Sequence, residues 1–223
     1  MFRALIASLA ALALTACFYR SSIDLAPMPD RMPTPVAGPG DYCEATASSP
    51  PYMVKSSEDC ERIAWDQATR TYVVASDEEG EEPRHWAPVA LGGNLYALQN
   101  DDGEESEAGR YHLMLVLANR SAFFMLPTLA RDKITALAAR HPGITVTLRE
   151  DADPIITAGE PAAIKAFLMD AAREALRGAN LEDEELSIAI RDRAGAPDHE
   201  ANGMQTMAII ELVTAIFALQ GEG

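Results

Sequence analysis

The pattern of apolar and polar positions changes along the chain from a period of two residues to a period near four. Short runs rich in β-forming residues occupy the first part of the body of the chain, with turn-forming residues between them, which is typical of an antiparallel meander. Two of the breaks, Gly92-Gly93-Asn94 and Asn119-Arg120-Ser121, suit tight hairpin turns. The five runs are Thr71–Ser76, Trp86–Leu91, Leu95–Gln99, Tyr111–Leu117 and Ala122–Leu126.

Helical periodicity begins after Pro127. Thr128 can cap a helix that runs to about Arg140, and Pro161 suits the first turn of another helix that Gly178 closes. This second helix carries an apolar stripe made of Ile164, Phe167, Leu168, Ala171 and Ala175. Short strands are expected at Ile144–Leu148, Ile155–Thr157 and Leu186–Ile190.

The last apolar segment, Met204–Leu219, has Glu211 as its sole charge. It is shorter than the roughly 20 residues that a membrane-spanning helix needs, so we expect a buried core helix. Its expected core residues are Met207, Ile210, Val213, Ile216 and Phe217. Together these patterns predict an α+β fold, in which an antiparallel β meander (about 70–126) is followed by helices and short strands packed on one face.

The first residues of the chain have the pattern of an export signal. One positive charge, Arg3, precedes an apolar run from Ala4 to Leu14, and Leu14-Thr15-Ala16-Cys17 closes it with a small residue and a cysteine. Residues 1–17 therefore resemble a bacterial lipoprotein signal peptide with its lipobox. The resemblance implies diacylglyceryl attachment to the Cys17 sulfur, cleavage before Cys17 and acylation of the new amino group. An ordinary secretory signal with an incidental cysteine is the alternative.

An acylated Cys17 predicts where the protein is held. Two or three acyl chains give lasting attachment to a bilayer, because each buried methylene contributes about 0.8 kcal/mol. Phe18 stands where an aspartate would, by the same resemblance, favour retention in the inner membrane. We therefore expect a lipid-anchored protein of the outer membrane that faces the periplasm, with the inner membrane as the alternative.

The chain divides into three expected segments. Residues 1–16 are the signal peptide, and residues 17–40 are a lipidated, disordered tether with five prolines that favour extended polyproline II geometry. Residues 41–223 are a single α+β periplasmic domain, long enough to build one core of its own.

The charge balance narrows the classes of partner. With 18 Lys+Arg against 34 Asp+Glu, the chain has a formal net charge of −16, which argues against nucleic acid and against electrostatic adhesion to anionic lipid as partners.

Two cysteines other than Cys17 remain, Cys43 and Cys60, and in an exported chain they most simply form a disulfide. The alternative of a metal or redox pair lacks Cys-x-x-Cys spacing and a nearby histidine.

No nucleophile elbow, zinc-protease helix, Walker loop or dinucleotide fingerprint occurs in the sequence. The four histidines, His85, His112, His141 and His199, form no metal-ligand spacing, so no metal site and no cofactor are expected. The acidic runs at residues 77–82 and 101–107 could bind cations weakly, since calcium prefers oxygen ligands. Neither has the residue order of a calcium loop, and a solubilising surface is the simpler interpretation.

These observations predict a non-catalytic envelope protein that Cys17 anchors in the lipid bilayer and that engages another envelope component, with an envelope protein as the expected partner. A small-ligand or cation-binding module that uses the acidic loops 77–82 and 101–107 is the first alternative. A hydrolase with an unrecognised site is the second alternative. An enzymatic role is not expected, because no catalytic motif is present.

Overall fold

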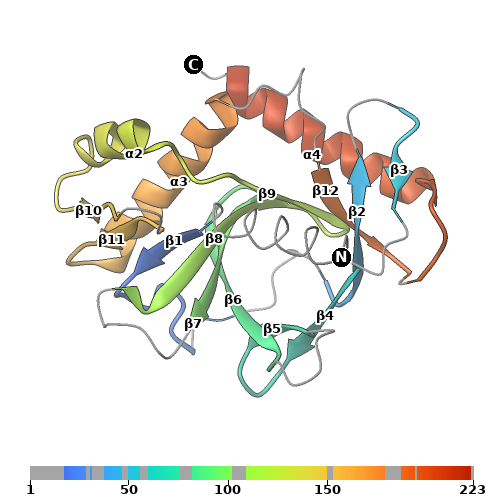
Figure 1. Cartoon of the computed structure of the whole chain (residues 1–223), viewed down its shortest axis with the longest axis horizontal. Helices are drawn as coiled ribbons and strands as arrows, with labels where there is room; N and C mark the ends of the chain where they lie inside the picture. Colours follow the sequence, from blue (N-terminus) through green and yellow to red (C-terminus); the bar gives the residue numbers. More distant parts are fainter. Residues whose placement is uncertain are drawn as a thin grey trace, which may run out of the picture.

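The computed structural model describes residues 18–28, 31, 38–46, 50–55, 60–75, 82–101, 109–149, 153–178, 187–193 and 195–221. In this part of the chain a β-barrel is covered on one side by three helices (Figure 1). The helices are α2 (Arg131–Ala138), α3 (Pro161–Gly178) and α4 (Gly203–Gly221). The strands are β1 (Phe18–Ser21), β2 (Gly40–Thr46), β3 (Met53–Val54), β4 (Glu61–Asp66), β5 (Thr71–Val74), β6 (Arg84–Gly92), β7 (Leu95–Asp101), β8 (Tyr111–Ala118), β9 (Ala122–Met125), β10 (Thr145–Thr147), β11 (Ile155–Thr157), β12 (Ser187–Asp192) and β13 (His199–Glu200).

Eight of the described strands close the barrel, in the hydrogen-bonded order β8, β7, β6, β5, β4, β2, β12, β9 and back to β8. Each of these pairings is antiparallel. β2 and β12 pair along their length, from Thr46 opposite Ser187 to Asp41 opposite Asp192. This pairing joins strands that lie far apart in the sequence. The predicted α+β class with an antiparallel meander is confirmed, and the meander is part of a closed barrel.

Side chains that alternate along the barrel strands enter two separate cores, as the period of two in a strand requires. One core fills the interior of the barrel and is rich in aromatic rings. The Tyr42 and Phe123 ring centroids lie 5.5 Å apart, and those of Trp65 and Tyr72 lie 5.0 Å apart. The buried residues of this core are Tyr42, Ile63, Tyr72, Val74, Trp86, Tyr96, Leu98, Met114, Val116, Ala118 and Phe123.

The second core lies between the outer surface of the barrel and the helices. Leu95, Leu115 and Leu117 supply its barrel side, and Phe167 and Leu168 of α3 lie in the same core. All five residues of the predicted α3 stripe are buried. The pattern of apolar residues therefore identified both the helix and the face that packs on the barrel.

The segment expected to form a tether is folded where the structure describes it. Phe18–Ser21 forms β1, which pairs antiparallel with β8 and parallel with β11. Tyr19 is fully buried, and Leu25 and Ala26 are also buried. The expectation of a disordered tether is wrong for residues 18–28, because β8 and β11 offer strand edges that proline content does not reveal. Residues 17, 29, 30 and 32–37 lie outside the described residues.

Side-chain hydrogen bonds hold the chain after β1 against the barrel. The Gln99 amide oxygen accepts the Leu25 N–H at 2.7 Å, and the Gln99 amide nitrogen donates to Asp24 at 2.6 Å. Arg31 donates to the carbonyl of Thr69, in the turn between β4 and β5. The N-terminal segment thus reaches from β7 to the β4–β5 hairpin.

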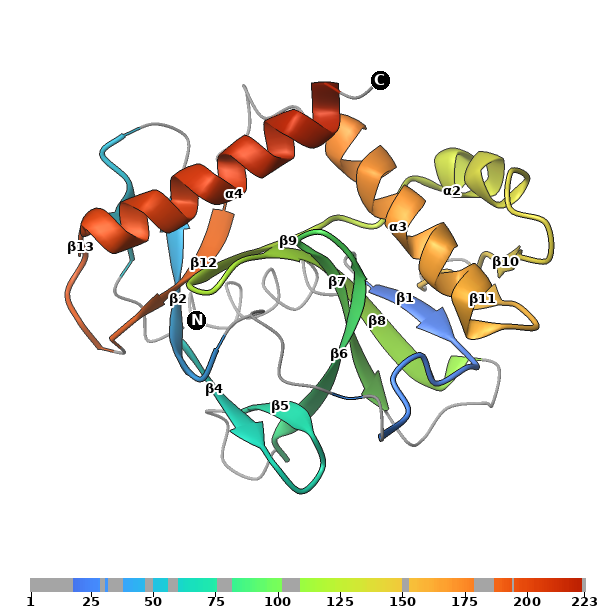
Figure 2. The ribbon, with the colours of Figure 1, turned by 180° about the vertical axis from the view of Figure 1, so that it is seen from behind.

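The predicted helix at Met204–Leu219 is present as α4, which lies across the top of the barrel from β13 to α3 (Figure 2). Its buried side carries Ile209, Leu212 and Ile216. The expectation that Met207, Ile210 and Phe217 lie in the core is wrong, because these side chains are 56%, 39% and 54% exposed. A helix that is apolar on nearly every side gives no stripe, so the packing of α3, β9 and β12 determines which side is buried.

Candidate functional site

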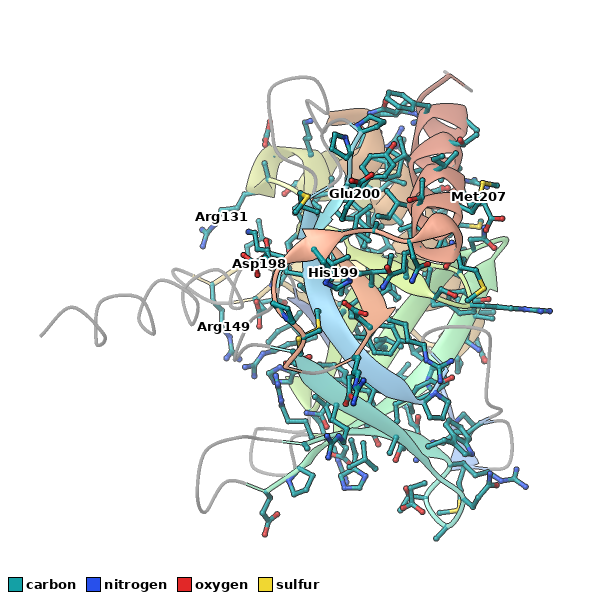
Figure 3. All side chains as sticks on the ribbon, turned by 90° about the vertical axis from the view of Figure 1, so that its right-hand side faces the viewer. Arg131, Arg149, Asp198, His199, Glu200 and Met207 are labelled. Carbon is teal, nitrogen blue, oxygen red and sulfur yellow. A yellow bond between two sulfur atoms is a disulfide. The ribbon has the colours of Figure 1, made fainter. Side chains whose placement is uncertain are left out.

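The outer side of α4 presents large apolar side chains to solvent. We call Met204, Met207, Ile210 and Phe217 the α4 apolar face; Met204 is 82% exposed. Figure 3 shows Met207 on the side of α4 that faces away from the barrel. By length and composition, Gly203–Gln220 is the one described helix segment apolar enough to cross a bilayer, yet Ile209, Leu212 and Ile216 bury its other side in the domain core. Large exposed apolar patches are typical of protein or membrane interaction sites, so this face is a candidate interaction surface.

A groove runs beside the C-terminal half of α4. It has a volume of about 340 Å³ and lies between the β6–β7 turn, α3 and α4. We call it the apolar groove, because its lining is mostly small or apolar: Gly92, Gly93, Leu95, Leu117, Met169, Ala215, Ala218 and Leu219, together with Asn94 and Arg173. A second, wider groove of about 630 Å³ lies beside the N-terminal half of α4 and also has Asn94 in its lining.

Two glycines of the β6–β7 turn line the apolar groove and add no side chain to it. Gly92 and Gly93 have φ angles of 137° and 56°, which glycine adopts without steric cost. A Cβ at Gly92 would lie 3.7 Å from the sulfur of Met169, whereas a Cβ at Gly93 would meet no heavy atom within 4 Å.

Arg173 of α3 also lines a cavity of about 280 Å³ that charged side chains surround. We call it the arginine pocket. The turn after α2 supplies Arg140 and His141, and α3 supplies Asp170, Arg173, Glu174 and Arg177. Three guanidinium groups thus face two carboxylates, which leaves a local surplus of positive charge in a strongly acidic protein.

The ion pairs inside the arginine pocket are loose. Arg173 lies 3.4 Å from Asp170, and Glu174 lies 3.4 Å from Arg177 and 4.0 Å from Arg140. Close charge-assisted hydrogen bonds measure about 2.7–2.9 Å, so these guanidinium groups retain donors for another acceptor. The buried Nε of Arg173 has no hydrogen-bond partner among the described residues.

His141 closes one wall of the arginine pocket and is firmly positioned. Its Nε2 lies 3.2 Å from Asp170, and its ring packs edge-on against Phe167 with centroids 5.5 Å apart. The side chain is 17% exposed. Because Phe167 is fully buried in the second core, between the barrel and the helices, this wall of the pocket is fixed to the fold.

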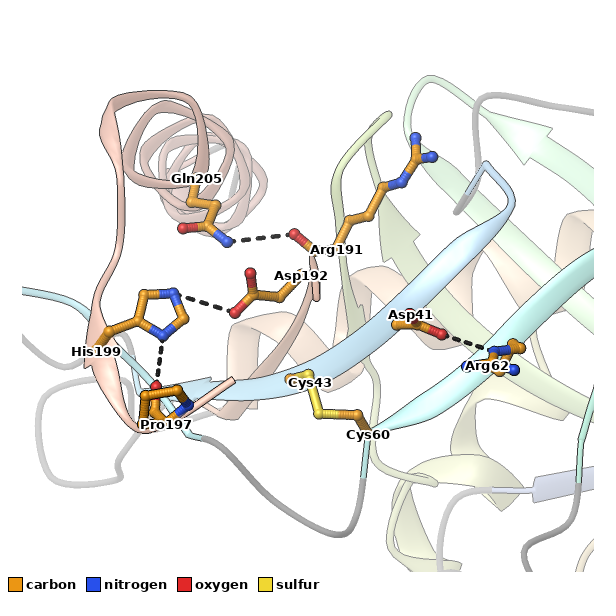
Figure 4. The surroundings of a disulfide bond; sticks show 9 residues. All are labelled: Asp41, Cys43, Cys60, Arg62, Arg191, Asp192, Pro197, His199 and Gln205. Atoms are coloured by element: carbon orange, nitrogen blue, oxygen red, sulfur yellow. Dashed lines mark hydrogen bonds and ion pairs between the residues drawn. A yellow bond between two sulfur atoms is a disulfide. The ribbon is translucent and has the colours of Figure 1, made fainter. Parts of the chain in front are cut away.

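The predicted disulfide is confirmed. Cys43 in β2 and Cys60, directly before β4, are joined by an S–S bond of 2.02 Å (Figure 4). Around it, Asp41 pairs with Arg62 at 3.0 Å, which adds a further link between β2 and β4. The bond therefore holds two adjacent barrel strands together, and this position indicates a structural role. The predicted lipidation site, Cys17, lies outside the described residues.

The four histidines lie apart from one another in the fold. His85 lies 3.1 Å from the Thr71 hydroxyl, and His112 is part of β8. His199 is held near Asp192 at 3.1 Å and near the Pro197 carbonyl at 2.9 Å (Figure 4). No group of three His, Cys, Asp or Glu side chains within the described residues could hold a metal ion.

The two acidic runs fall almost entirely outside the described residues. Of the run at 101–107, Asp101 is described at the end of β7, where Arg110 donates two hydrogen bonds to its carboxylate at 2.7 and 2.8 Å. Of the run at 77–82, only Glu82 is described. The cation-binding alternative thus stays a prediction.

Asp153 forms a second partly buried charge cluster beside β1. Burial raises the pKa of its carboxyl, and the nearby Arg20 and His112 act in the opposite direction. The Arg20 guanidinium lies 3.6 Å from Asp153, and both side chains are less than one sixth exposed. The pair links β1 to the residues before β11, so we assign it to the fold.

Sequence reasoning missed the arginine pocket. Asp170, Arg173, Glu174 and Arg177 are spaced by three and four residues, a pattern that indicates ion pairs along an exposed helix face. Nothing local places the end of α2 opposite that face. The chain matches no protein-family model, and it has no match among curated proteins or among solved structures.

Proposed function

We propose that the chain is an acylated lipoprotein of the bacterial envelope, anchored through Cys17 at the outer membrane with its domain in the periplasm. It acts without catalysis, by binding another envelope component through the α4 apolar face. The observation that carries this proposal is the exposure of Met204, Met207, Ile210 and Phe217 on one helix. Covering such side chains is favourable, since full burial of each contributes about 1.5–3 kcal/mol.

The charge of the chain selects the kind of component. A formal net charge of −16 repels a second copy and repels anionic lipid headgroups. The expected partner is therefore an envelope protein with an apolar groove and a surplus of positive charge around it. Glu211 is the only charged residue of α4, and it would pair with a basic residue at the rim of that groove.

The anchor and the barrel are close together along the chain. Cys17 directly precedes Phe18, the first residue of β1, and consecutive Cα atoms are about 3.8 Å apart. A lipid on Cys17 would therefore hold the domain at the bilayer surface without a flexible spacer. The partner would have to present its groove close to the membrane.

Substitution of Cys17 tests the anchor. The Cys17→Ser chain should leave the membrane fraction or stay as an uncleaved precursor, because the acyl chains have no other attachment point. Fractionation with mass analysis of the N-terminus reads the result. A mature Cys17→Ser chain that has lost its signal segment and still stays in the membrane fraction would remove the anchor from this proposal.

Photocrosslinking tests the partner. A photoreactive amino acid at Met207 of the full chain should crosslink a discrete envelope protein, and the same amino acid at Ala64, on the exposed outer surface of β4, should not. Equal crosslinking from both positions, or only lipid adducts from Met207, would contradict a protein partner for the α4 apolar face.

A small-ligand module is the second candidate function. It is favoured by a different observation: Arg173 lines both the arginine pocket and the apolar groove.

A further inference from the structure

We infer that the arginine pocket and the apolar groove form one binding site for an anionic amphiphile, a lipid with a phosphate headgroup and one acyl chain in the groove. The site lies between α3, the turn after α2, the β6–β7 turn and the C-terminal half of α4, and Ile210 and Phe217 of the α4 apolar face are not in its lining. This inference goes beyond the proposed function, because it needs neither the Cys17 anchor nor a protein partner.

The headgroup end follows from the chemistry of the arginine pocket. Arg140, Arg173 and Arg177 present planar guanidinium groups that suit the oxygens of a phosphate. Each of their ion pairs with Asp170 or Glu174 measures 3.4–4.0 Å and involves a single carboxylate oxygen. The guanidinium groups can therefore donate to a phosphate without losing a close ion pair.

The acyl end follows from the lining of the apolar groove. Ala215, Ala218 and Leu219 of α4 line the groove together with Met169 of α3, and the glycines of the β6–β7 turn add no side chain to it. A linear hydrocarbon suits a narrow groove of small side chains, and methionine adapts its shape to such a ligand. A polar ligand would find few hydrogen-bond partners there.

Arg173 joins the two halves, because it lines both cavities. A molecule whose charge sits at the guanidinium groups therefore has its tail directed past Arg173 into the apolar groove. The two volumes, about 280 and about 340 Å³, together fall within the roughly 300–1,000 Å³ that is typical of small-molecule sites.

The test uses the full chain and an alkyl phosphate with a diazirine at the end of its chain. Light should attach the probe to peptides that contain Met169 or Leu219, which line the apolar groove. Unlabelled dodecyl phosphate should suppress this labelling, whereas inorganic phosphate and dodecyl maltoside at the same concentration should not. These competitors separate the headgroup from the chain.

Two variants test the two halves of the site. Arg173→Gln should weaken labelling about tenfold, the effect of losing one charged hydrogen bond. Ala218→Glu places a charge in the groove at an exposed position and should abolish labelling of Met169 and Leu219 peptides. Arg62→Gln, on the exposed surface of β4, is the matched control and should leave labelling unchanged. Thermal unfolding of each variant shows that the fold is kept.

Three outcomes would overturn the inference. Equal suppression by dodecyl maltoside would show an apolar groove that ignores the headgroup. Equal suppression by inorganic phosphate would show an anion site that ignores the chain. Labelling that stays at the wild-type level in folded Arg173→Gln would exclude the arginine pocket as the headgroup site.

Discussion

The Tyr19 hydroxyl accepts the backbone N–H of Leu129 at a distance of 3.0 Å, although 110 residues separate the two along the chain. Both residues are buried. Tyr19 is also only two residues from Cys17. The predicted lipidation site, Cys17, therefore directly precedes in sequence a strand, β1, whose Tyr19 side chain is fixed in the core of the domain.

Substitution of Tyr19 tests this bond. Tyr19→Phe leaves the N–H of Leu129 buried without its acceptor, and we expect the free energy of unfolding to fall by about 1–3 kcal/mol. Urea unfolding measures the change. Tyr111→Phe, at a half-buried position in the neighbouring β8, is the control and should cost less. Equal unfolding midpoints for wild type and Tyr19→Phe would contradict a stabilising role for the bond.

The domain should lose stability at alkaline pH through two tyrosines. Burial raises the pKa of Tyr19 to about 12 and the pKa of Tyr42 to about 12. The folded state therefore disfavours the phenolate form, and the stability from these groups is present below about pH 10 and is lost as the pH rises toward 12.

Urea unfolding at pH about 9 and about 11.5 measures this loss. Tyr42→Phe, which removes a phenol whose hydroxyl donates to the Gly38 carbonyl, should show a smaller loss between the two pH values than wild type. The same loss in wild type and in Tyr42→Phe would exclude Tyr42 as a source of the alkaline sensitivity.

The disulfide should contribute measurably to stability. Cys43 and Cys60 are 17 positions apart, and closing a segment of this size contributes about 3 kcal/mol in the chain-entropy model. The double variant Cys43→Ser, Cys60→Ser should lower the free energy of unfolding by about that amount. Alkylation before and after reduction should find both thiols blocked in the native protein. Two freely alkylated thiols would contradict the pairing.

Neighbouring residues of α4 should respond in opposite ways. Ile216 is fully buried, so Ile216→Ala should cost about 2–5 kcal/mol of unfolding free energy. Phe217 is 54% exposed, so Phe217→Ser should change stability by no more than about 0.5 kcal/mol. If the α4 apolar face binds a partner, Phe217→Ser should also reduce the yield of crosslinks from a photoreactive amino acid at Met207. Loss of folding in Phe217→Ser would show that this face belongs to the core.

Local patterns predicted those parts of the fold that depend on neighbouring residues. The expected runs Leu95–Gln99 and Tyr111–Leu117 are within β7 and β8, and the expected helix Pro161–Gly178 is α3. Gly92-Gly93 turns the β6–β7 hairpin with positive φ angles, as such a turn requires. Hairpins and amphipathic helices produce characteristic patterns within short stretches of sequence, so they can be predicted from a single sequence.

Long-range pairing was not predictable in the same way. Closure of the barrel depends on the pairing of β2 with β12, in which Cys43 lies opposite Ile190. No local sequence pattern predicts which strand pairs with β2. The arginine pocket depends on Arg140 of the α2 end meeting Glu174 of α3. The prolines after Phe18 predicted an extended spacer, although Tyr19 is fixed between two strands that occur much later in the chain.

The position of β1 has a consequence for how the protein can be made. β1 lies between β8 and β11, so this strand waits during synthesis for residues up to Thr157 before both of its neighbours exist. At roughly 5–20 residues per second, that delay is on the order of ten seconds or more. A chain shortened to begin at residue 41 would lack this strand and leave the edge of β8 at Tyr111–Met114 unpaired. Such an edge is a template for aggregation, so the shortened domain is expected to be poorly soluble.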